Sequence, residues 1–403
     1  MTRIASLAFE GCSGLTSIEI PNSVTSISSS AFRDCSSLIT VTVNSNEIMG
    51  KTYTSGSNLK TIFGSQVKQY VIGDEVASIG NYAFCGCSSL TSIEIPNGVT
   101  SIGSSAFQSC SGLTSIEIPN SVTNIGSSAF EGCCGLTSIE VPNSVTNIGN
   151  YAFKDCSSLK SITIPSSVTS IGEKAFNGCS SLASIVVAAG NSIYDSRDNS
   201  NAIIETSTNT LIYGCKYTKI PNSVTSIGEY AFYGCSGLAS IEIPSSVTSI
   251  GNSTFADCNG LTSIEISNSM TDIGNYAFKG CSRLASVTIN SSDIMSKTYT
   301  SSSNLNTIFG DQVKLYVIGD EVTSIGDYAF CGCRGLTSIE VPNSVMSIGN
   351  YAFKGCSSLT KVIVPDIAAW CNISVQGNES NPLYIAKHLY SDETTEITDL
   401  VIT

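Results

Sequence analysis

The sequence has 403 residues with a formal net charge of −13, and it contains only 19 lysines and arginines. A chain with so few basic residues has no positive face to neutralise phosphates, so neither nucleic acid nor an anionic membrane surface is an expected partner. No apolar run approaches the roughly 20 residues that a bilayer-spanning helix needs, so membrane insertion is not expected. The first residues, MTRIASLAFEGC, do not have the pattern of a secretory signal.

The chain is a tandem repeat with a period of 23 residues, the distance from Phe9 to Phe32. It begins in mid-repeat, because TRIASLAF at 2–9 aligns with TSISSSAF at 25–32. Within each copy, apolar residues fall at regular points and small polar residues lie between them. Such a unit cannot close a core alone and must stack on its neighbour, which indicates a solenoid.

Each unit contains a strand and two shorter elements. In SIEIP, the alternation of Ile18, Glu19 and Ile20 is the period of a strand with isoleucine inward and glutamate outward. NSVTSIG predicts a turn and a second extended segment, and SSAFQSC predicts about one helical turn. The strands are expected to form one long parallel sheet of sixteen, with first inward residues at Ile18, Val41, Tyr70, Ile93, Ile116, Ile139, Ile162, Ile185, Thr218, Ile241, Ile264, Val287, Tyr316, Ile339, Val362 and Leu400.

These units resemble the BspA-like, or Treponema-type, leucine-rich repeats of bacteria and protists. The copy from Cys110 matches the family pattern at Cys110, Leu113, Ile116, Ile118, Pro119, Val122, Ile125, Gly126, Ala129 and Phe130. The resemblance covers nearly the whole chain and implies an α/β solenoid. This would be a right-handed, curved superhelix with a long parallel β-sheet on the concave face and short helical turns and extended segments on the convex side. It also implies a secreted or surface-anchored protein that binds macromolecules, often as an adhesin.

Twelve of the 17 cysteines occupy one column of the repeat, three residues after the phenylalanine. Stacked coils place such side chains about 4.8 Å apart and parallel, whereas a disulfide needs Cβ atoms about 3.5–4.5 Å apart that face each other. A buried thiol behaves as a small apolar group, so a structural cysteine ladder is predicted. Its members are Cys12, Cys35, Cys87, Cys110, Cys133, Cys156, Cys179, Cys235, Cys258, Cys281, Cys333 and Cys356.

The spacing gives less support to a chemical role for the cysteines. A zinc site needs Cys and His ligands from separate loops, but the cysteines recur once per coil and His388 is the only histidine, so no metal is expected. One histidine near the C-terminus also leaves no base for a nucleophile, and no cofactor is expected. In the two CGC triplets, Cys85 and Cys331 would lie on the convex edge, where an exposed reactive thiol is the alternative.

Two lengthened coils interrupt the period, at 44–69 and 290–315. Their surroundings are nearly identical over 41–87 and 287–333, which are 246 residues apart, and this indicates duplication of a block of several coils. Each such coil has 29 residues, so six extra residues are expected opposite the strand. They form either a tolerated loop or a binding epitope that is presented twice.

Two further segments depart from the repeat. The insert at 188–217 contains AIIETSTNTLIYG, which predicts a β-hairpin standing off the solenoid. Its DSRDN at 195–199 has oxygen ligands for calcium but lacks the glycine and distal glutamate of an EF-hand loop. In the irregular coil at 366–403, Trp370 is expected to pack on the last regular coil rather than to stack on a sugar. Both ends of the solenoid are open, which favours end-to-end self-association.

The outward strand residue is glutamate in seven of the sixteen units: Glu19, Glu94, Glu117, Glu140, Glu242, Glu265 and Glu340. Neighbouring carboxylates about 5 Å apart in water repel by roughly 0.8 kcal/mol, a cost that solvent can absorb. The row is therefore either a solvated face or an acidic stripe on the concave surface that binds a basic partner or attracts divalent cations.

As a whole, the sequence predicts one non-enzymatic solenoid over 1–403 that binds a protein or glycoprotein, such as host matrix, through the concave face and the inserts. It is expected outside the cell or on the cell surface. The alternative is a structural stalk that presents another domain. Carbohydrate binding is a third possibility, for which the only candidate aromatic row is Tyr82, Tyr151, Tyr230, Tyr276, Tyr328 and Tyr351 on the convex side.

Overall fold

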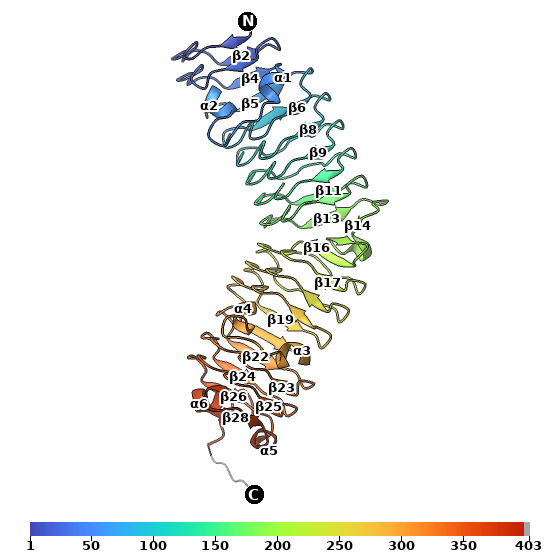
Figure 1. Ribbon diagram of the computed structural model, residues 1–403, viewed down its shortest axis with the longest axis vertical. Coiled ribbons are helices and arrows are strands. Elements are labelled where there is room, and N and C mark those ends of the chain that lie inside the picture. Colours follow the sequence, from blue (N-terminus) through green and yellow to red (C-terminus); the bar gives the residue numbers. More distant parts are fainter. Residues whose placement is uncertain (399–403) are drawn as a thin grey trace. The chain divides into compact units, whose positions relative to one another are not determined.

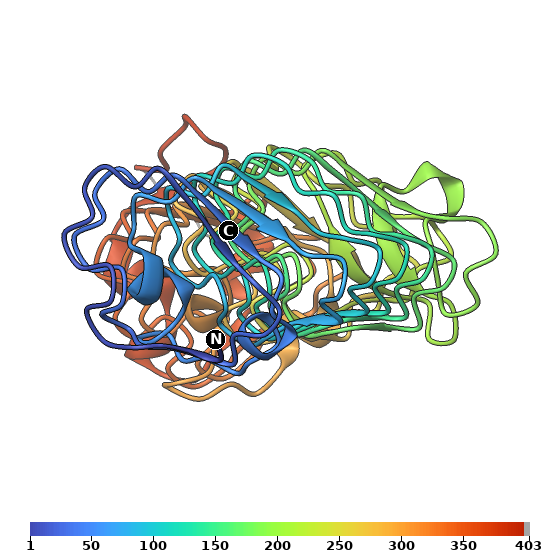
Figure 2. The ribbon, with the colours of Figure 1, turned by 90° about the horizontal axis from the view of Figure 1, so that it is seen from above.

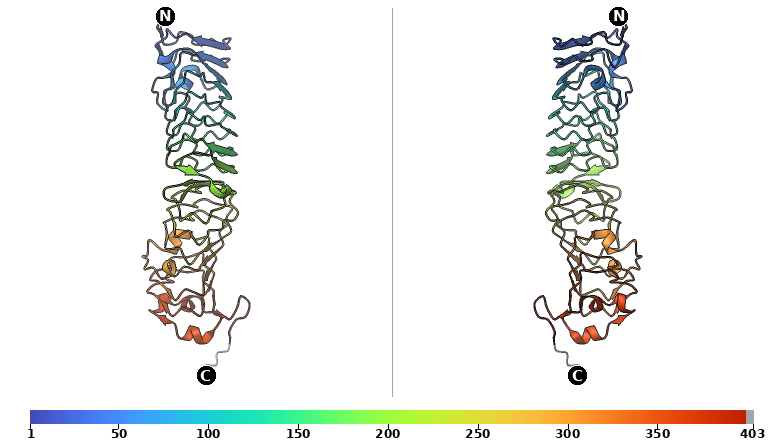
Figure 3. Two further views of the ribbon diagram at one scale, coloured as in Figure 1. Left: turned by 90° about the vertical axis from the view of Figure 1, so that its right-hand side faces the viewer. Right: turned by 90° about the vertical axis from the view of Figure 1, so that its left-hand side faces the viewer.

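The computed structural model describes residues 1–398 and divides the chain into two units, Met1–Ser196 and Arg197–Thr403. In each unit the coils lie one above another (Figures 1 and 3). Seen along the stack, successive coils of the first unit follow one another closely in outline (Figure 2). Neighbouring coils pair through parallel strands, so the predicted solenoid is confirmed.

The first unit has two rows of parallel strands and one lengthened coil. One row carries the outward glutamates, and we call its outer surface the Glu face. The strands of this row are β2 (Ser17–Ile20), β4 (Thr40–Val43), β5 (Gln69–Ile72), β7 (Ser92–Glu94), β11 (Ser161–Ile164) and β13 (Ser184–Val187). The second row contains β1 (Arg3–Ile4), β3 (Ser26–Ile27), β6 (Ser78–Ile79), β8 (Ser101–Ile102), β9 (Asn124–Ile125), β10 (Asn147–Ile148) and β12 (Ser170–Ile171). The remaining elements are α1 (Asn46–Met49), α2 (Leu59–Phe63) and β14 (Tyr194–Asp195).

The second unit repeats this plan. Its Glu-face row contains β19 (Ser263–Ile266), β21 (Ser286–Ile289), β22 (Leu315–Ile318), β24 (Ser338–Glu340), β26 (Lys361–Ile363) and β28 (Leu389–Tyr390). Its second row contains β16 (Thr210–Gly214), β17 (Ser226–Ile227), β18 (Ser249–Ile250), β20 (Asp272–Ile273), β23 (Ser324–Ile325), β25 (Ser347–Ile348) and β27 (Ser374–Val375). The other elements are β15 (Ala202–Glu205), the helices α3 (Ser292–Ser296), α4 (Leu305–Phe309), α5 (Ile367–Cys371) and α6 (Pro382–Ala386), and the 3-10 helices η1 (Arg197–Asn199) and η2 (Asn378–Ser380).

The Glu-face strands do not form the one long sheet that the sequence predicts. In the described part of the chain they pair in the blocks β2-β4-β5-β7, β11-β13 and β19-β21-β22-β24-β26-β28. The coils of Ile116, Ile139, Thr218 and Ile241 have no strand there. The second row stays paired from β6 to β12, across the first of these gaps. The strand predicted at Leu400 lies outside the described residues, and β28 is the partner of β26.

The core consists of side-chain columns that run along each stack. The rings of Phe84, Phe107 and Phe130 are fully buried, and neighbouring centroids lie 5.1 and 5.3 Å apart in nearly parallel planes. In the second unit, Trp370 on α5 is half-buried and packs against the core, as expected. Stacking of identical side chains from successive coils therefore buries what no single coil could bury.

The Ala-Phe segment forms successive tight turns rather than the predicted helical turn. In one coil, Gln108 N donates to Ser105 O at 3.2 Å, and Cys110 N donates to Phe107 O at 3.1 Å. Ser105 has a φ of 54°, in the left-handed region, which a right-handed helix does not allow. The helical turn predicted for this position is therefore wrong in its geometry, although the chain reverses direction there as expected.

These turns also join neighbouring coils through backbone hydrogen bonds, which we call turn rungs. Ser105 N, Phe107 N and Ser109 N donate to carbonyls of the next coil at 2.7 to 2.8 Å. The coils of Phe84, Phe130 and Phe153 have the same three rungs. The turn segment thus forms a third ladder beside the two rows of strands.

A glycine column allows neighbouring coils to approach closely at the end of the second row. A Cβ atom on Gly126 would lie 2.6 Å from both the Gly103 carbonyl carbon and Ser104 N, closer than real Cβ contacts. Glycine is required there because the neighbour is backbone, which cannot move aside without separating the coils. In the second coil this position is Ser28.

The extra residues of the lengthened coils form short capped helices. Ser45 and Ser291 cap α1 and α3 by accepting hydrogen bonds from Ile48 N at 3.2 Å and Ile294 N at 3.0 Å. Asn58 caps α2 in a reciprocal capping box with Thr61. The duplicated sequence therefore gives the same local structure in both units.

The hairpin of the insert lies within the solenoid, and the prediction that it stands off is wrong. β15 and β16 pair in the antiparallel sense, and β16 then pairs in parallel with β17. Leu211 on β16 is fully buried and lies opposite Ile227. The hairpin is retained in the stack because its second strand supplies the apolar residue that a regular coil would place in the second row.

Candidate binding surface

The structure places all seven predicted glutamates on the outside of the Glu face. Six are exposed and Glu340 is half-buried. Within residues 1–398, none of the seven forms an ion pair with a lysine or an arginine. Three accept hydrogen bonds from amide side chains: Glu19 from Asn44 Nδ2 at 2.7 Å, Glu265 from Asn290 Nδ2 at 2.8 Å, and Glu94 from Gln69 Nε2 at 3.4 Å.

The amide partners belong to the duplicated block and were not predicted as site residues. Asn44 and Asn290 each follow the strand that pairs with the glutamate strand, so the backbone register places amide beside carboxylate. Their signal in the sequence is the recurrence of asparagine at the same place in both copies, 246 residues apart.

Three of the gaps in the sheet fall where glutamate follows glutamate in the stack. No strand ladder in the described residues joins the coils of Glu94, Glu117 and Glu140, or those of Glu242 and Glu265. Where pairing persists, the outward neighbour of a glutamate is neutral, as in Glu19↔Thr42, Val71↔Glu94, Glu265↔Thr288, Val317↔Glu340 and Glu340↔Ile363. The gaps also include the steps from Glu140 to Thr163 and from Lys219 to Glu242, which do not join like charges.

Like charges directly opposite each other in a sheet cost about 0.2–1 kcal/mol, which is comparable with the net value of one backbone hydrogen bond at about 0.5–1.5 kcal/mol. We expect repulsion of this size to contribute at the three gaps that join glutamates. The gaps from Glu140 to Thr163 and from Lys219 to Glu242 need another cause.

Hollows form on the Glu face where the strands separate in the second unit. One, of about 440 Å³, lies between the coils of Glu242 and Glu265 and has both carboxylates and Ile264 in its lining. Another, of about 410 Å³, lies between the coils of Lys219 and Glu242. Unpaired strands and acidic side chains thus meet at one place on the surface.

The cysteine column lies beneath the turns, in the core. Eleven of its twelve members are buried, and all 17 cysteines of the chain are free thiols. The thiol typically donates to the phenylalanine carbonyl of the preceding coil, as Cys110 does to Phe84 O and Cys133 to Phe107 O, both at 3.1 Å. Burial raises the pKa of Cys133 to about 12 and that of Cys110 well above its usual range. Such thiols stay protonated at neutral pH, when only the thiolate is a good nucleophile.

In the duplicated block, a glutamine takes the carbonyl that the thiol would otherwise use. Gln66 Nε2 donates to Phe63 O at 3.0 Å, and Gln312 Nε2 donates to Phe309 O. The following ladder cysteine, Cys87, is buried without this bond, and its pKa is raised to about 12 by burial. The sequence signal is the pair of IFGSQ and IFGDQ motifs, which the repeat analysis did not single out.

Three cysteine predictions are corrected. Cys85 and Cys331, placed on the convex edge with an exposed reactive thiol as the alternative, are each only 9% exposed, and burial raises the pKa of both thiols. The Cys85 thiol donates to Gln108 Oε1 of the next coil at 3.7 Å. Cys12, expected in the buried ladder, is exposed. The exposed thiols outside the column are Cys134 and Cys371.

The row of tyrosines lies on the turn segment, and all six residues have a left-handed backbone with φ of 55–60°. Tyr276 and Tyr351 are exposed, and the other four are half-buried. Only Tyr328 and Tyr351 occupy adjacent coils, and their rings lie 5.1 Å apart. Lys279 and Lys354 lie 4.8 and 4.9 Å from the ring centroids of Tyr276 and Tyr351, so cations cover part of this row.

Residues 1–398 hold no cluster of three or more His, Cys, Asp or Glu side chains arranged for a metal ion, and this includes the segment at 195–199. In the same part of the chain, no helix has the length and apolar character that crossing a bilayer requires.

Comparison with known proteins supports the resemblance. The family model described as BspA type leucine rich repeat region (6 copies) matches residues 1–76, 77–200, 208–314 and 310–371. No curated protein matches. A leucine-rich cell surface protein of Faecalibacterium prausnitzii is 31% identical with a TM-score of 0.50, over 93% of this chain and 86% of that one.

Two further solved structures are similar. A leucine-rich repeat protein of Bacteroides ovatus is 30% identical with a TM-score of 0.52, over 73% of this chain and 74% of that one. The pneumococcal vaccine antigen PcpA shares the fold, with 18% identity and a TM-score of 0.53 over 93% and 91% of the two chains.

Proposed function

The chain belongs to the BspA-type leucine-rich repeat family, and on this premise we propose that it is a surface or secreted adhesion module that binds a basic segment of a protein or glycoprotein through the Glu face. The family is one of non-enzymatic repeat proteins, and the relative from F. prausnitzii is a cell surface protein. The inserts widen the surface that a partner would contact. We assign no catalytic role to the chain.

One observation carries this proposal: six of the seven glutamates of the Glu face are exposed, and no lysine or arginine within residues 1–398 pairs with any of the seven. Between Glu242 and Glu265 they border a hollow in which strand backbone is unpaired. A guanidinium or ammonium group from a partner would complement both the carboxylates and the open carbonyls. Protein interfaces of this kind gain specificity and association rate from charge complementarity.

Biosensor binding to a panel of matrix and plasma glycoproteins, at low and at physiological salt, tests the proposal. The variant Glu94→Gln, Glu117→Gln and Glu140→Gln should bind at least tenfold more weakly, since each charge-assisted contact is worth about 1.5–3 kcal/mol. Physiological salt should weaken the binding of the natural chain more than that of the variant, because salt screens exposed charges.

The matched control changes the same number of charges away from both the Glu face and the inserts: Glu173→Gln, Glu229→Gln and Asp257→Asn, all of which are exposed. It should bind as the natural chain does. Equal weakening by both triple variants would show a net-charge effect and contradict a specific Glu-face site. No saturable binding to any glycoprotein would favour the structural stalk.

A further inference from the structure

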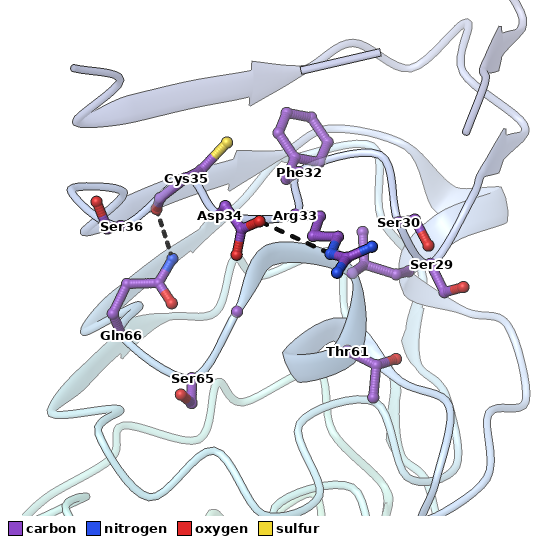
Figure 4. A pocket seen from close by; sticks show the side chains of 12 residues that line it. Ser29, Ser30, Phe32, Arg33, Asp34, Cys35, Ser36, Thr61, Ser65 and Gln66 are labelled. Carbon is purple, nitrogen blue, oxygen red and sulfur yellow. Dashed lines mark hydrogen bonds and ion pairs between the residues drawn. The ribbon is translucent and has the colours of Figure 1, made fainter. Parts of the chain in front are cut away.

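The first unit has a hollow on the turn side, away from the glutamate row. It has a volume of about 420 Å³ and lies between the turn of Phe32 and the lengthened coil that contains α2. Figure 4 shows the lining side chains, with Ser30, Arg33 and Asp34 on the turn and Thr61 and Gln66 on the lengthened coil. Most of these side chains carry hydroxyl, amide or charged groups.

The hollow lies where the turn rungs are missing. Among the hydrogen bonds of residues 1–398, Ser30 N, Phe32 N and Asp34 N have no acceptor, and the Thr61 and Ile62 carbonyls have no donor. Regular coils use all three N–H groups to bond to the next coil, as described above for Phe107. Three donors and two acceptors of the backbone therefore border one polar cavity.

In the second copy of the duplicated block, turn rungs are present at the positions that border the cavity in the first copy. There Tyr276 N donates to Thr307 O at 3.0 Å and Phe278 N donates to Ile308 O at 2.9 Å, at positions 246 residues after Ser30, Thr61, Phe32 and Ile62. The lengthened coils are nearly identical, so the difference comes from the turn that precedes them. That turn reads SSSAFRD at 28–34 and GNYAFKG at 274–280.

The sequence difference explains the opening. Tyr276 has a φ of 60°, whereas Ser30 is not among the residues of positive φ within 1–398. The N–H of Ser30 therefore points in a different direction from that of Tyr276. The open cavity is therefore encoded in this one turn.

We propose that this cavity binds one or two sugar units and prefers a sugar that carries a carboxylate. A hydroxyl group can donate to a carbonyl and accept from an N–H at once, which suits a border made of both. Its volume of about 420 Å³ is in the lower part of the range of small-molecule pockets, about 300–1,000 Å³.

Arg33 gives the preference for a carboxylate. Its guanidinium lies 3.8 Å from Glu10 and 3.7 Å from Asp34, and its side chain is 64% exposed, so neither carboxylate holds it firmly. A uronic acid would place its carboxylate against the Arg33 guanidinium and the unpaired N–H groups, which are the donors on this border. The ring hydroxyls would then reach Asp34 and the Thr61 carbonyl.

Isothermal titration of the full chain with glucuronate, glucose and acetate tests the proposal. Glucuronate should bind at one site per chain and at least tenfold more tightly than glucose or acetate, because only glucuronate has both the carboxylate and the hydroxyls. The absence of saturable glucuronate binding, or equal affinity for acetate, would overturn the proposal.

Two variants locate the site. Replacing 28–34 by the sequence of 274–280, through Ser28→Gly, Ser29→Asn, Ser30→Tyr, Arg33→Lys and Asp34→Gly, should close the cavity and abolish binding while the circular dichroism spectrum is unchanged. Arg33→Gln leaves the fold untouched and should lower glucuronate affinity roughly tenfold, to the level of glucose. Binding that survives both changes would contradict the assignment.

This site is independent of the Glu face. The Glu94→Gln, Glu117→Gln and Glu140→Gln variant should bind glucuronate as the natural chain does, so that failure of either proposal leaves the other standing. An acidic peptide that binds where glucuronate does not would overturn the sugar assignment.

Discussion

Two stretches of the Glu face have the same repeat and differ in how their strands pair. From β19 to β26 every strand pairs with its neighbour, and the outward residues run Glu265, Thr288, Val317, Glu340 and Ile363. Between β7 and β11 the coils of Glu117 and Glu140 have no strand on the Glu face. Ile116 and Ile139 are nevertheless buried, as inward residues should be. Burial of the inward side chains is therefore not sufficient to close the sheet.

The comparison shows that the core and the second strand row can hold a coil whose Glu-face strand is unpaired. In the open stretch, β8, β9 and β10 remain paired and the turn rungs are complete. A ladder at the Glu face adds to these contacts, and we expect its outward side chains to influence whether it forms. Binding groups can thus be exposed at low cost in stability.

The largest effect on stability is expected when a buried ring is removed from the core beneath the coils of Glu117 and Glu140. Phe130→Ala should lower the free energy of unfolding by about 3–5 kcal/mol, because the ring is fully buried and stacked on both sides. In urea denaturation with hydrogen exchange, the open coils should lose protection together. The matched variant Phe330→Ala should leave protection of β22 largely intact. A loss below about 1 kcal/mol for Phe130→Ala would contradict this account.

Alkaline pH should lower the free energy of unfolding, because it deprotonates the buried cysteines beneath the coils of Glu117 and Glu140 when the chain unfolds. The pKa of Cys133 is raised from 9.0 to about 12, chiefly by burial. Its contribution is complete below about pH 9 and is lost as the pH rises toward 12, because the unfolded chain releases a proton that the folded chain keeps. The full effect is up to roughly 4 kcal/mol per thiol. Thermal unfolding between pH 8 and 11 checks this expectation, and Cys133→Ala should reduce the slope.

A smaller effect is expected inside the paired stretch of the first unit. Tyr70 on β5 is fully buried, and within residues 1–398 its hydroxyl has no hydrogen-bond partner. Tyr70→Phe should therefore stabilise the chain by about 1 kcal/mol. Tyr53→Phe is the matched control and should destabilise it by a similar amount, since Tyr53 donates to Ile48 O at 2.7 Å. Equal shifts of the urea midpoint in the same direction would contradict the assignment.

The smallest effect tests the link between charge and pairing directly. Glu117→Thr places a neutral side chain between Glu94 and Glu140, and it should close the ladder and stabilise the chain by about 0.5 kcal/mol. Thr42→Glu makes the reverse change beside Glu19 and should open β4. Hydrogen exchange at residues 115–117 and 40–43 reports both changes. Unchanged protection in both variants would show that like charge does not control the gaps.

The sequence by itself determined the repeat and everything that depends on one coil. The period of 23, the inward isoleucines, the buried phenylalanine and the free-thiol column all follow from residues close together in the chain. Local side-chain patterning is enough for these features, because each coil must bury the same stripe against its neighbours. The hairpin at 202–214 was also predictable, since its two strands and turn are contiguous.

Only the tertiary structure decided how neighbouring coils meet. The gaps beside Glu117, the burial of Cys85 and the hollow beside Arg33 each depend on groups from coils at least 23 residues apart. In these places we expect a rung or a ladder worth about 1 kcal/mol to compete with a charge or a turn conformation of similar cost. The residue pattern within one repeat does not reveal which of two such small free energies is larger. The candidate binding sites lie where neighbouring coils do not pair.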